Sequence, residues 1–291
     1  MSRLVSTSLL LGIASLPVLS QEGGQREMQP DRAPIYKVTV ERRAIPAINY
    51  GHRSQSTKIG FRGTVLLPSA KGEAVVRSRV GAVEIDAKFE HLEPPTRFGR
   101  EYLTYVLWAI TPDGRTQNLG EVVANGSNKA RLRVTTSMQA FGAIVTAEPY
   151  FAVAHPSNVV VLENELRRDT AGKVEEVEAK YELLPRAPQP LSAEHVNLRP
   201  ADSTVANKVP QDQYEAVLAL YQARNALQIA RAQGASREAV ATLQQAEQLY
   251  QQAQQLQAEK ADSKRVVLTA REAAQAAEDA RTIAERRKRP E

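Results

Sequence analysis

The side chains that could carry catalytic or metal-binding chemistry are a few carboxylates and four isolated histidines. Glu84 and Asp86 alternate along one predicted strand, so they share a face and could seat a cation or act as an acid and base. Alternating charge on a solvent-facing strand explains the same pattern without a site, as it does for Glu175, Glu176 and Glu178. None of the histidines has a second histidine or a helical carboxylate at ligand spacing. They are His52, His91, His155 and His195.

The chain lacks the local motifs of the common enzyme classes. It has no cysteine, which excludes disulfides, cysteine nucleophiles and cysteine–zinc sites in this sequence. Phosphate-binding and dinucleotide-binding glycine loops, the serine nucleophile elbow and the zinc-protease helix motif are also missing. The net charge of +5 is spread along the chain and indicates solubility more than a nucleic-acid partner. We therefore predict a non-enzymatic protein with no cofactor, no metal site and no assignable ligand-binding residue.

Aromatic side chains are the next candidates for binding. Trp108 lies with Tyr102 and Tyr105 in an apolar stretch, which favours core packing over a sugar-stacking platform. Tyr150 and Phe151 follow a predicted strand and precede a loop, which makes them the more plausible exposed aromatic pair.

A basic run, Arg286–Arg289, closes the last predicted helix. It could contact phosphate or an acidic envelope polymer, but basic residues also suit the carbonyl end of a helix without any ligand. The run is short and carries no stacking aromatics, so we do not expect nucleic-acid binding.

The stretch Tyr102–Gly114 reads as a central strand, because both of its alternating faces are apolar. It ends at Pro112-Asp113-Gly114, a tight turn into a return strand. Residues 35–184 contain about nine such short strands, which predicts an all-β immunoglobulin-like sandwich. We expect Ile45–Arg53 to be a loop. The other predicted strands are Ile35–Val40, Lys58–Leu67, Glu73–Arg79, Val83–Phe89, Gln117–Ala124, Ala130–Thr135, Ala143–Ala147, Asn158–Glu163 and Val174–Leu183.

Composition changes after a proline-rich linker at residues 185–209. From there to residue 288 the chain is rich in Ala, Gln, Glu and Arg, and we predict an all-α, antiparallel three-helix hairpin bundle. The expected helices span Gln211–Gln233, Arg237–Lys260 and Lys264–Arg287, with Ser236 as N-cap of the second and Gly234 ending the first. The third carries a seam of small residues, Val266, Ala270, Ala273, Ala277, Ala280 and Ala284. An alanine seam buries little area, so the bundle needs support from the sandwich or from another copy of itself.

We predict an export signal at the N-terminus, the alternative being the frayed N-terminus of a cytosolic protein. Residues 1–20 combine Arg3, an apolar core and a small-residue cleavage site, as secretory signal peptides do. Residues 21–34 read as a flexible lead-in and residues 289–291 as a tail. We expect no membrane span after the signal is removed.

Three strings, EYLTYVLWAITPDGRTQNLGEV, IVTAEPYFAV and PSNVVVLEN, resemble the N-terminal β-domain of uncharacterised bacterial envelope proteins of the OmpA family. The segment Tyr214–Arg287 resembles the helical region that follows it there, and together they cover most of residues 35–288. In that family a peptidoglycan-binding module with an Asn-x-x-Leu-Ser-x-x-Arg-Ala motif commonly comes next. This sequence ends at Glu291 without the motif, so peptidoglycan anchoring does not carry over.

The resemblance implies a periplasmic or outer-envelope location and an interaction role. We therefore expect a periplasmic adaptor that binds other envelope proteins or cell-wall polymer, with self-association through the Ala-rich helices. The alternative is a carbohydrate- or peptidoglycan-binding module.

Overall fold

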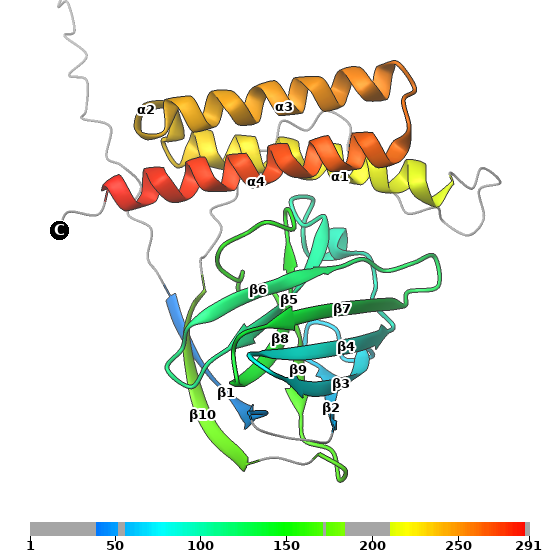
Figure 1. Cartoon of the computed structure of the whole chain (residues 1–291), viewed down its shortest axis with the longest axis vertical. Coiled ribbons are helices and arrows are strands. Elements are labelled where there is room, and N and C mark those ends of the chain that lie inside the picture. Colours follow the sequence, from blue (N-terminus) through cyan, green and yellow to red (C-terminus); the bar gives the residue numbers. More distant parts are fainter. Residues whose placement is uncertain (1–38, 52–55, 171–172, 184–209, 289–291) are drawn as a thin grey trace, which may run out of the picture. The chain divides into compact units, whose positions relative to one another are not determined.

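Strands occupy the first half of the chain and helices the second, as predicted (Figure 1). The computed structural model describes residues 39–51, 56–170, 173–183 and 210–288. The predicted signal (1–20), lead-in (21–34), linker (185–209) and tail (289–291) lie outside the described residues, as do His52 and His195. All the described residues belong to one compact unit, Tyr36–Glu291.

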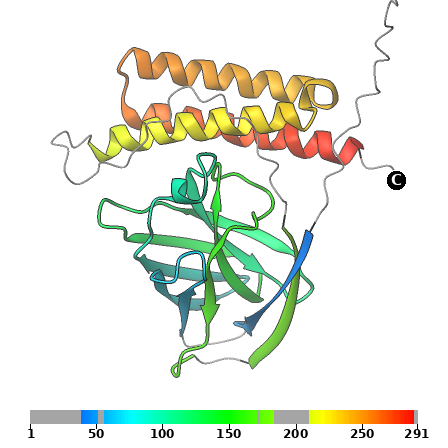
Figure 2. The ribbon, with the colours of Figure 1, turned by 180° about the vertical axis from the view of Figure 1, so that it is seen from behind.

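The ten described strands form an antiparallel sheet whose main path runs β10-β1-β8-β9-β2-β3-β4-β7. Strand β5 branches from β8 and carries β6 on its other side. Figure 2 shows β1 and β10 running side by side along their length. The strands are β1 Thr39–Asn49, β2 Thr57–Gly63, β3 Lys71–Arg79, β4 Ala82–Glu90, β5 Thr104–Ile110, β6 Thr116–Val122, β7 Ala130–Thr136, β8 Ala140–Glu148, β9 Val160–Glu165 and β10 Lys173–Leu183, with a short 3-10 helix η1, Pro95–Phe98, before β5.

Strand β5 is buried along its whole length, which confirms the prediction from its two apolar faces. One face, with Tyr105 and Leu107, packs into a cluster of residues from the strands. The other face, with Val106, Trp108 and Ile110, belongs to a second cluster that also contains alanines of the helices. This second cluster therefore joins side chains of β5 to residues of other strands and to alanines of the helices.

The turn after β5 has the predicted chemistry. Gly114 takes a φ of 84°, a left-handed conformation that glycine adopts without strain, and its N–H donates to the carbonyl of Thr111 at 2.8 Å. The two strands that flank this turn pair with a bulge between Leu107 and Trp108.

Strand β1 corrects the predicted loop at Ile45–Arg53. It continues through Asn49 and pairs with β10 from Thr39 onward. Pro46 suggests a loop because proline has no N–H to donate to a sheet. Here its carbonyl oxygen accepts a hydrogen bond from Nδ2 of Asn164 at 2.9 Å, and the flanking Ile45 is buried. Burial of the neighbouring apolar side chains outweighs the missing donor.

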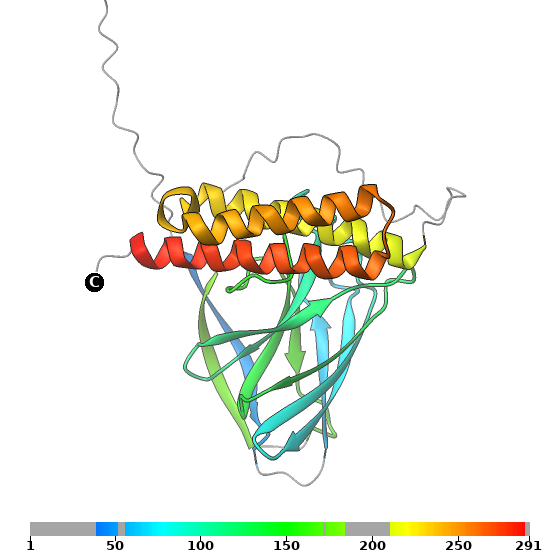
Figure 3. The same ribbon diagram turned by 45° about the horizontal axis from the view of Figure 1, so that its top comes forward.

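The helices are α1 Gln211–Ala232, α2 Ala235–Glu238, α3 Val240–Ala258 and α4 Ser263–Lys288. The three long ones lie side by side (Figure 3). Gly234, at φ 88°, follows α1 as predicted. The predicted N-cap role of Ser236 is wrong: it lies inside α2, and α3 begins after Ala239, whose backbone is not helical (φ −140°, ψ 43°). The alanine-rich sequence there contains no breaker, so the interruption is not visible from residue types.

The predicted seam of α4 is confirmed, because every one of its residues is completely buried. Lys288 at the end of α4 donates to the carbonyl oxygen of Gln233 at the end of α1, so these two helices end at the same place. The alanine side chains of this seam are therefore buried within the single chain, between α4 and the elements that pack against it.

Candidate functional site

The loop after β8, residues 149–157, makes polar contacts with the helices. Tyr150 is only 1% exposed, and Phe151 is half-buried with the guanidinium of Arg271 3.9 Å from its ring centre. The predicted exposed aromatic pair is therefore wrong. The sequence places these residues beside a loop but contains no signal that α4 covers them.

Glu278 of α4 is the acceptor at the centre of this contact. Its Oε2 accepts from the hydroxyl of Tyr150 at 2.6 Å, and its Oε1 accepts from the backbone N–H of Ala154 at 2.8 Å. Arg281, one turn further along α4, donates to both oxygens at 2.8 Å. The carboxylate is 3% exposed and fully engaged, so its charge is neutralised inside the protein.

Burial by itself would lower the pKa of Arg281, since it penalises the charged form. The hydrogen bonds and negative charge of Glu278, with smaller contributions from Tyr150 and Glu285, outweigh burial and raise that pKa. Arg281 therefore stays charged in the folded protein, and it forms a buried ion pair with Glu278.

Glu121 of β6 forms a second joint that links three other elements. Its Oε1 accepts from Thr104 of β5 at 2.7 Å and from Gln222 of α1 at 2.6 Å. Its Oε2 forms an ion pair with Arg271 of α4 at 2.6 Å, and the carboxylate side chain is 4% exposed. The amide oxygen of Gln222 also accepts the backbone N–H of Phe151 at 2.9 Å. Helices α1 and α4 are thus hydrogen-bonded to the same strand pair and loop.

The large aromatics of the central strand are structural. Trp108 is fully buried, and its Nε1 donates to the hydroxyl of Thr146 at 2.8 Å. The hydroxyl of Tyr105 donates to the carbonyl of Glu93 at 2.6 Å, and burial raises its pKa. Tyr102 is also buried. These positions offer no stacking surface for a sugar, in agreement with core packing.

Glu84 and Asp86 lie on the outer face of β4, where each is paired with arginine. Asp86 accepts from Arg131 at 2.7 Å and from Arg133 at 3.1 Å, and Glu84 pairs with Arg79 at 3.1 Å. The hydrogen bond from Arg131 is the main cause that lowers the pKa of Asp86 to about 2, against the opposing effect of desolvation. These pairings fit a charged solvent-facing strand. The glutamates at 175, 176 and 178 lie in β10, whose side chains are outside the description.

Basic side chains at the end of α4 donate hydrogen bonds to backbone carbonyl oxygens at the ends of other helices. Arg287 donates to the carbonyl oxygen of Glu238 and Lys288 to that of Gln233. His91 is exposed in the loop after β4. Across the described ranges, no cluster of three His, Asp or Glu residues could hold a metal ion. No described helix combines the length and apolarity needed to cross a membrane.

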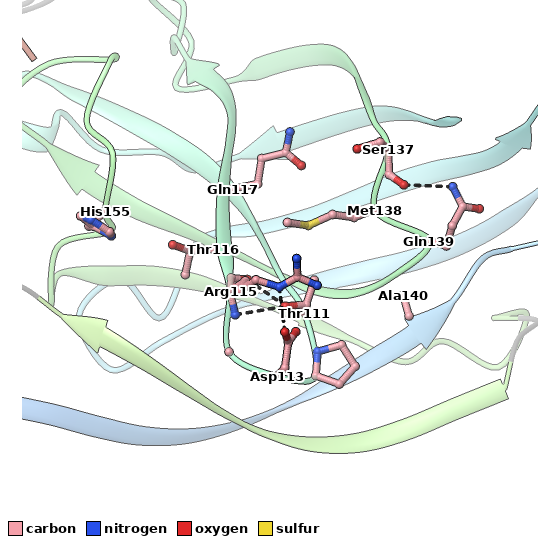
Figure 4. A pocket seen from close by; sticks show the side chains of 12 residues that line it. Thr111, Asp113, Arg115, Thr116, Gln117, Ser137, Met138, Gln139, Ala140 and His155 are labelled. Atoms are coloured by element: carbon pink, nitrogen blue, oxygen red, sulfur yellow. Dashed lines mark hydrogen bonds and ion pairs between the residues drawn. The ribbon is translucent and has the colours of Figure 1, made fainter. Parts of the chain in front are cut away.

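An open cavity of about 960 Å³ lies on the strand-rich half (Figure 4). It lies between the β5–β6 turn and the segment from β7 to β8, with His155 of the long loop on one side. Gln117, Met138 and Gln139 are among its lining residues, and Met138 is drawn between the two glutamines. Asp113 and Arg115 form an exposed ion pair at 2.7 Å along its edge. Of the two histidines that the structure describes, His155 lines this cavity.

Sequence reasoning missed the polar side chains that make these contacts: Glu121, Gln222, Arg271, Glu278 and Arg281. Their available signal is that Glu278 and Arg281 interrupt the alanines of α4 three residues apart, on one face of the helix. Such a break suggests a buried pair but does not identify its partner. We compared the chain with models of known protein families and with curated proteins, and none of them matches.

Proposed function

We propose that the protein is an exported, non-enzymatic adaptor of the cell envelope, whose strand-rich and helical halves form one rigid attachment piece. The observation that carries this proposal is the pair of buried joints at Glu121 and Glu278, which tie α1 and α4 to the strands. Fixed, desolvated contacts suit a protein that holds binding surfaces at a set spacing. A hinged enzyme would need contacts that open and close between its halves.

We further infer that the strands fold as an immunoglobulin-like sandwich and that the long helices form an antiparallel hairpin bundle. Successive side chains of β5 belong alternately to two apolar clusters, which supports the first inference. The contacts of Arg287 with Glu238 and of Lys288 with Gln233 support the second, because they bring the end of α4 to the start of α3 and the end of α1.

Location is the first part of the test. Fusing residues 1–20 to alkaline phosphatase should produce active, exported enzyme, while the same fusion with Arg3 and the apolar core deleted should not. Retention of the full-length protein in the cytosol of its native cells would remove the basis of the proposal.

Contact with envelope components is the second part. A photo-crosslinking amino acid at Gln251, exposed on α3, or at Arg133, exposed on β7, should give defined products in intact cells. The products should contain an envelope protein or peptidoglycan. The same amino acid at Ala273, which is fully buried, is the matched control and should give none. Products that are absent, or that contain only cytosolic proteins, would contradict the adaptor role.

A carbohydrate- or peptidoglycan-binding role is the second candidate. Burial of Tyr105, Trp108 and Tyr150 removes its original aromatic basis. The polar cavity beside Gln117 and Gln139 is the observation that favours it instead.

A further inference from the structure

We propose that the cavity between the β5–β6 turn and the β7–β8 segment binds an uncharged saccharide. The proposal deepens the second candidate function and rests on it, and it does not depend on the adaptor role. The cavity has a volume of about 960 Å³, which is at the upper end of the usual range for ligand pockets, and it is open to solvent. Figure 4 shows the residues that line it.

Two side-chain amides on facing walls are held in defined orientations. The Oε1 of Gln117 accepts a hydrogen bond from the hydroxyl of Thr136 at 2.6 Å, which leaves its Nε2 as a donor. The Nε2 of Gln139 donates to the carbonyl of Ser137 at 3.2 Å, which leaves its Oε1 as an acceptor. Neither of these remaining atoms has a partner within the described part of the chain. The cavity lining therefore contains one amide donor and one amide acceptor that a ligand could engage.

A hydroxyl group matches both, because it donates and accepts at once. An anion satisfies only the donor and a cation only the acceptor. The charged residues on the rim do not change this preference, since Asp113 and Arg115 are paired with each other. The chemistry of the walls thus favours a neutral ligand with many hydroxyls.

The apolar part of the cavity fits the same ligand class. Met138 lies between the two amides in Figure 4, and Pro112 contributes at the turn. A thioether and a proline ring give van der Waals contact to the C–H face of a sugar ring. Among the lining residues there is no tryptophan, tyrosine or phenylalanine, so we expect weak binding without the gain from ring stacking.

The test is titration of the purified full-length protein with three tetrasaccharides, followed by calorimetry and saturation-transfer NMR. Two are neutral, maltotetraose and the N-acetylglucosamine tetramer, and one is charged, tetragalacturonate. We expect binding of at least one neutral tetramer and at least about tenfold weaker binding of the charged one.

Gln117→Glu is the decisive variant, because its carboxylate can still accept from Thr136 while the donor facing the cavity is replaced by an acceptor. It should weaken binding of the neutral tetramer at least about tenfold. Gln139→Ala should weaken it too and carries the test if Gln117→Glu does not fold. Gln251→Ala, on the exposed face of α3, is the matched control and should bind as the parent does.

Three results would overturn the proposal: no binding of either neutral tetramer, binding unchanged in both cavity variants, or tighter binding of an uncharged Gly-Ser tetrapeptide than of either sugar. These experiments use purified protein and defined sugars. Their failure is therefore distinguishable from a failure of export or of cross-linking in cells.

Discussion

The hydroxyl of Tyr150 donates a hydrogen bond to the carboxylate of Glu278 at 2.6 Å, across 128 positions of the chain. Neither residue is more than 3% exposed. Because Tyr150 follows β8 and Glu278 lies in α4, this bond is one of those that join the strand-rich half to the last helix.

Replacing Tyr150 with phenylalanine keeps the ring and removes the donor. Glu278 then lacks one partner in a site that water does not reach, so we expect the free energy of unfolding to fall by about 1–3 kcal/mol. Urea unfolding followed by circular dichroism measures this change. Tyr250→Phe, at a half-buried tyrosine of α3, is the control and should change it by less than about 0.5 kcal/mol. Equal effects of the two substitutions would contradict the role assigned to Tyr150.

Glu121→Ala removes the acceptor shared by Thr104, Gln222 and Arg271. Gln222 is buried and Arg271 is partly exposed, so we expect a loss of about 2–3 kcal/mol rather than the larger cost of an isolated buried charge. Hydrogen exchange should show faster opening of α1 and α4 against the strands. Glu247→Ala, which breaks only the surface pair with Arg231, should cost less than about 1 kcal/mol. A Glu121 variant with parental exchange rates in both helices would argue against the joint.

Asp86 makes stability depend on acidity. Its pKa is lowered in the folded state from 3.8 to about 2, so its contribution is present above about pH 4 and is lost as the pH falls toward 2. The arginine partners are more than half exposed, so we expect only about 1 kcal/mol. Asp86→Asn should therefore be less stable than the parent at pH 7 and equal to it near pH 2.

Urea midpoints of parent and variant at pH 2, 3, 4 and 7 check this dependence. Adding 1 M NaCl at pH 7 should shrink the difference, because salt screens exposed charges. A difference that stays constant across the pH series would mean that Asp86 stabilises the fold by something other than its charge.

Ala277→Leu tests the close packing of α4. Ala277 is completely buried in a seam of small residues, so a larger side chain forces neighbouring helices apart. We expect a loss of about 1–3 kcal/mol, or failure to fold. Thermal unfolding measures it, with Ala258→Leu, at the exposed end of α3, as the neutral control. A leucine at 277 that leaves the melting temperature unchanged would show that the seam has room to spare.

The predictable parts of this fold are those that periodicity determines. The two-sided apolar pattern of β5 and the repeat of small residues in α4 both specify which side chains are buried, and both are confirmed. The turn at Gly114 and the end of α1 at Gly234 follow from the conformational freedom of glycine. These are local properties, and neighbouring residues are enough to determine them.

The remaining features depend on contacts between distant segments. Tyr150 is buried because α4 packs against it. Strand β1 continues through Pro46 because it pairs with β10 and because Asn164 donates to the Pro46 carbonyl. No window of neighbouring residues contains that information. The cavity shares this property, since Gln117 and Gln139 meet only when the β5–β6 turn and the β7–β8 segment come together.

Trp108 is the only tryptophan in the protein, and it lies in the cluster that strands and helices share. Its fluorescence consequently reports on the packing of that shared cluster. Far-ultraviolet circular dichroism, in contrast, is dominated by the helices. Comparing the two signals in one denaturation experiment tells whether the halves come apart together or in sequence, without attaching any label.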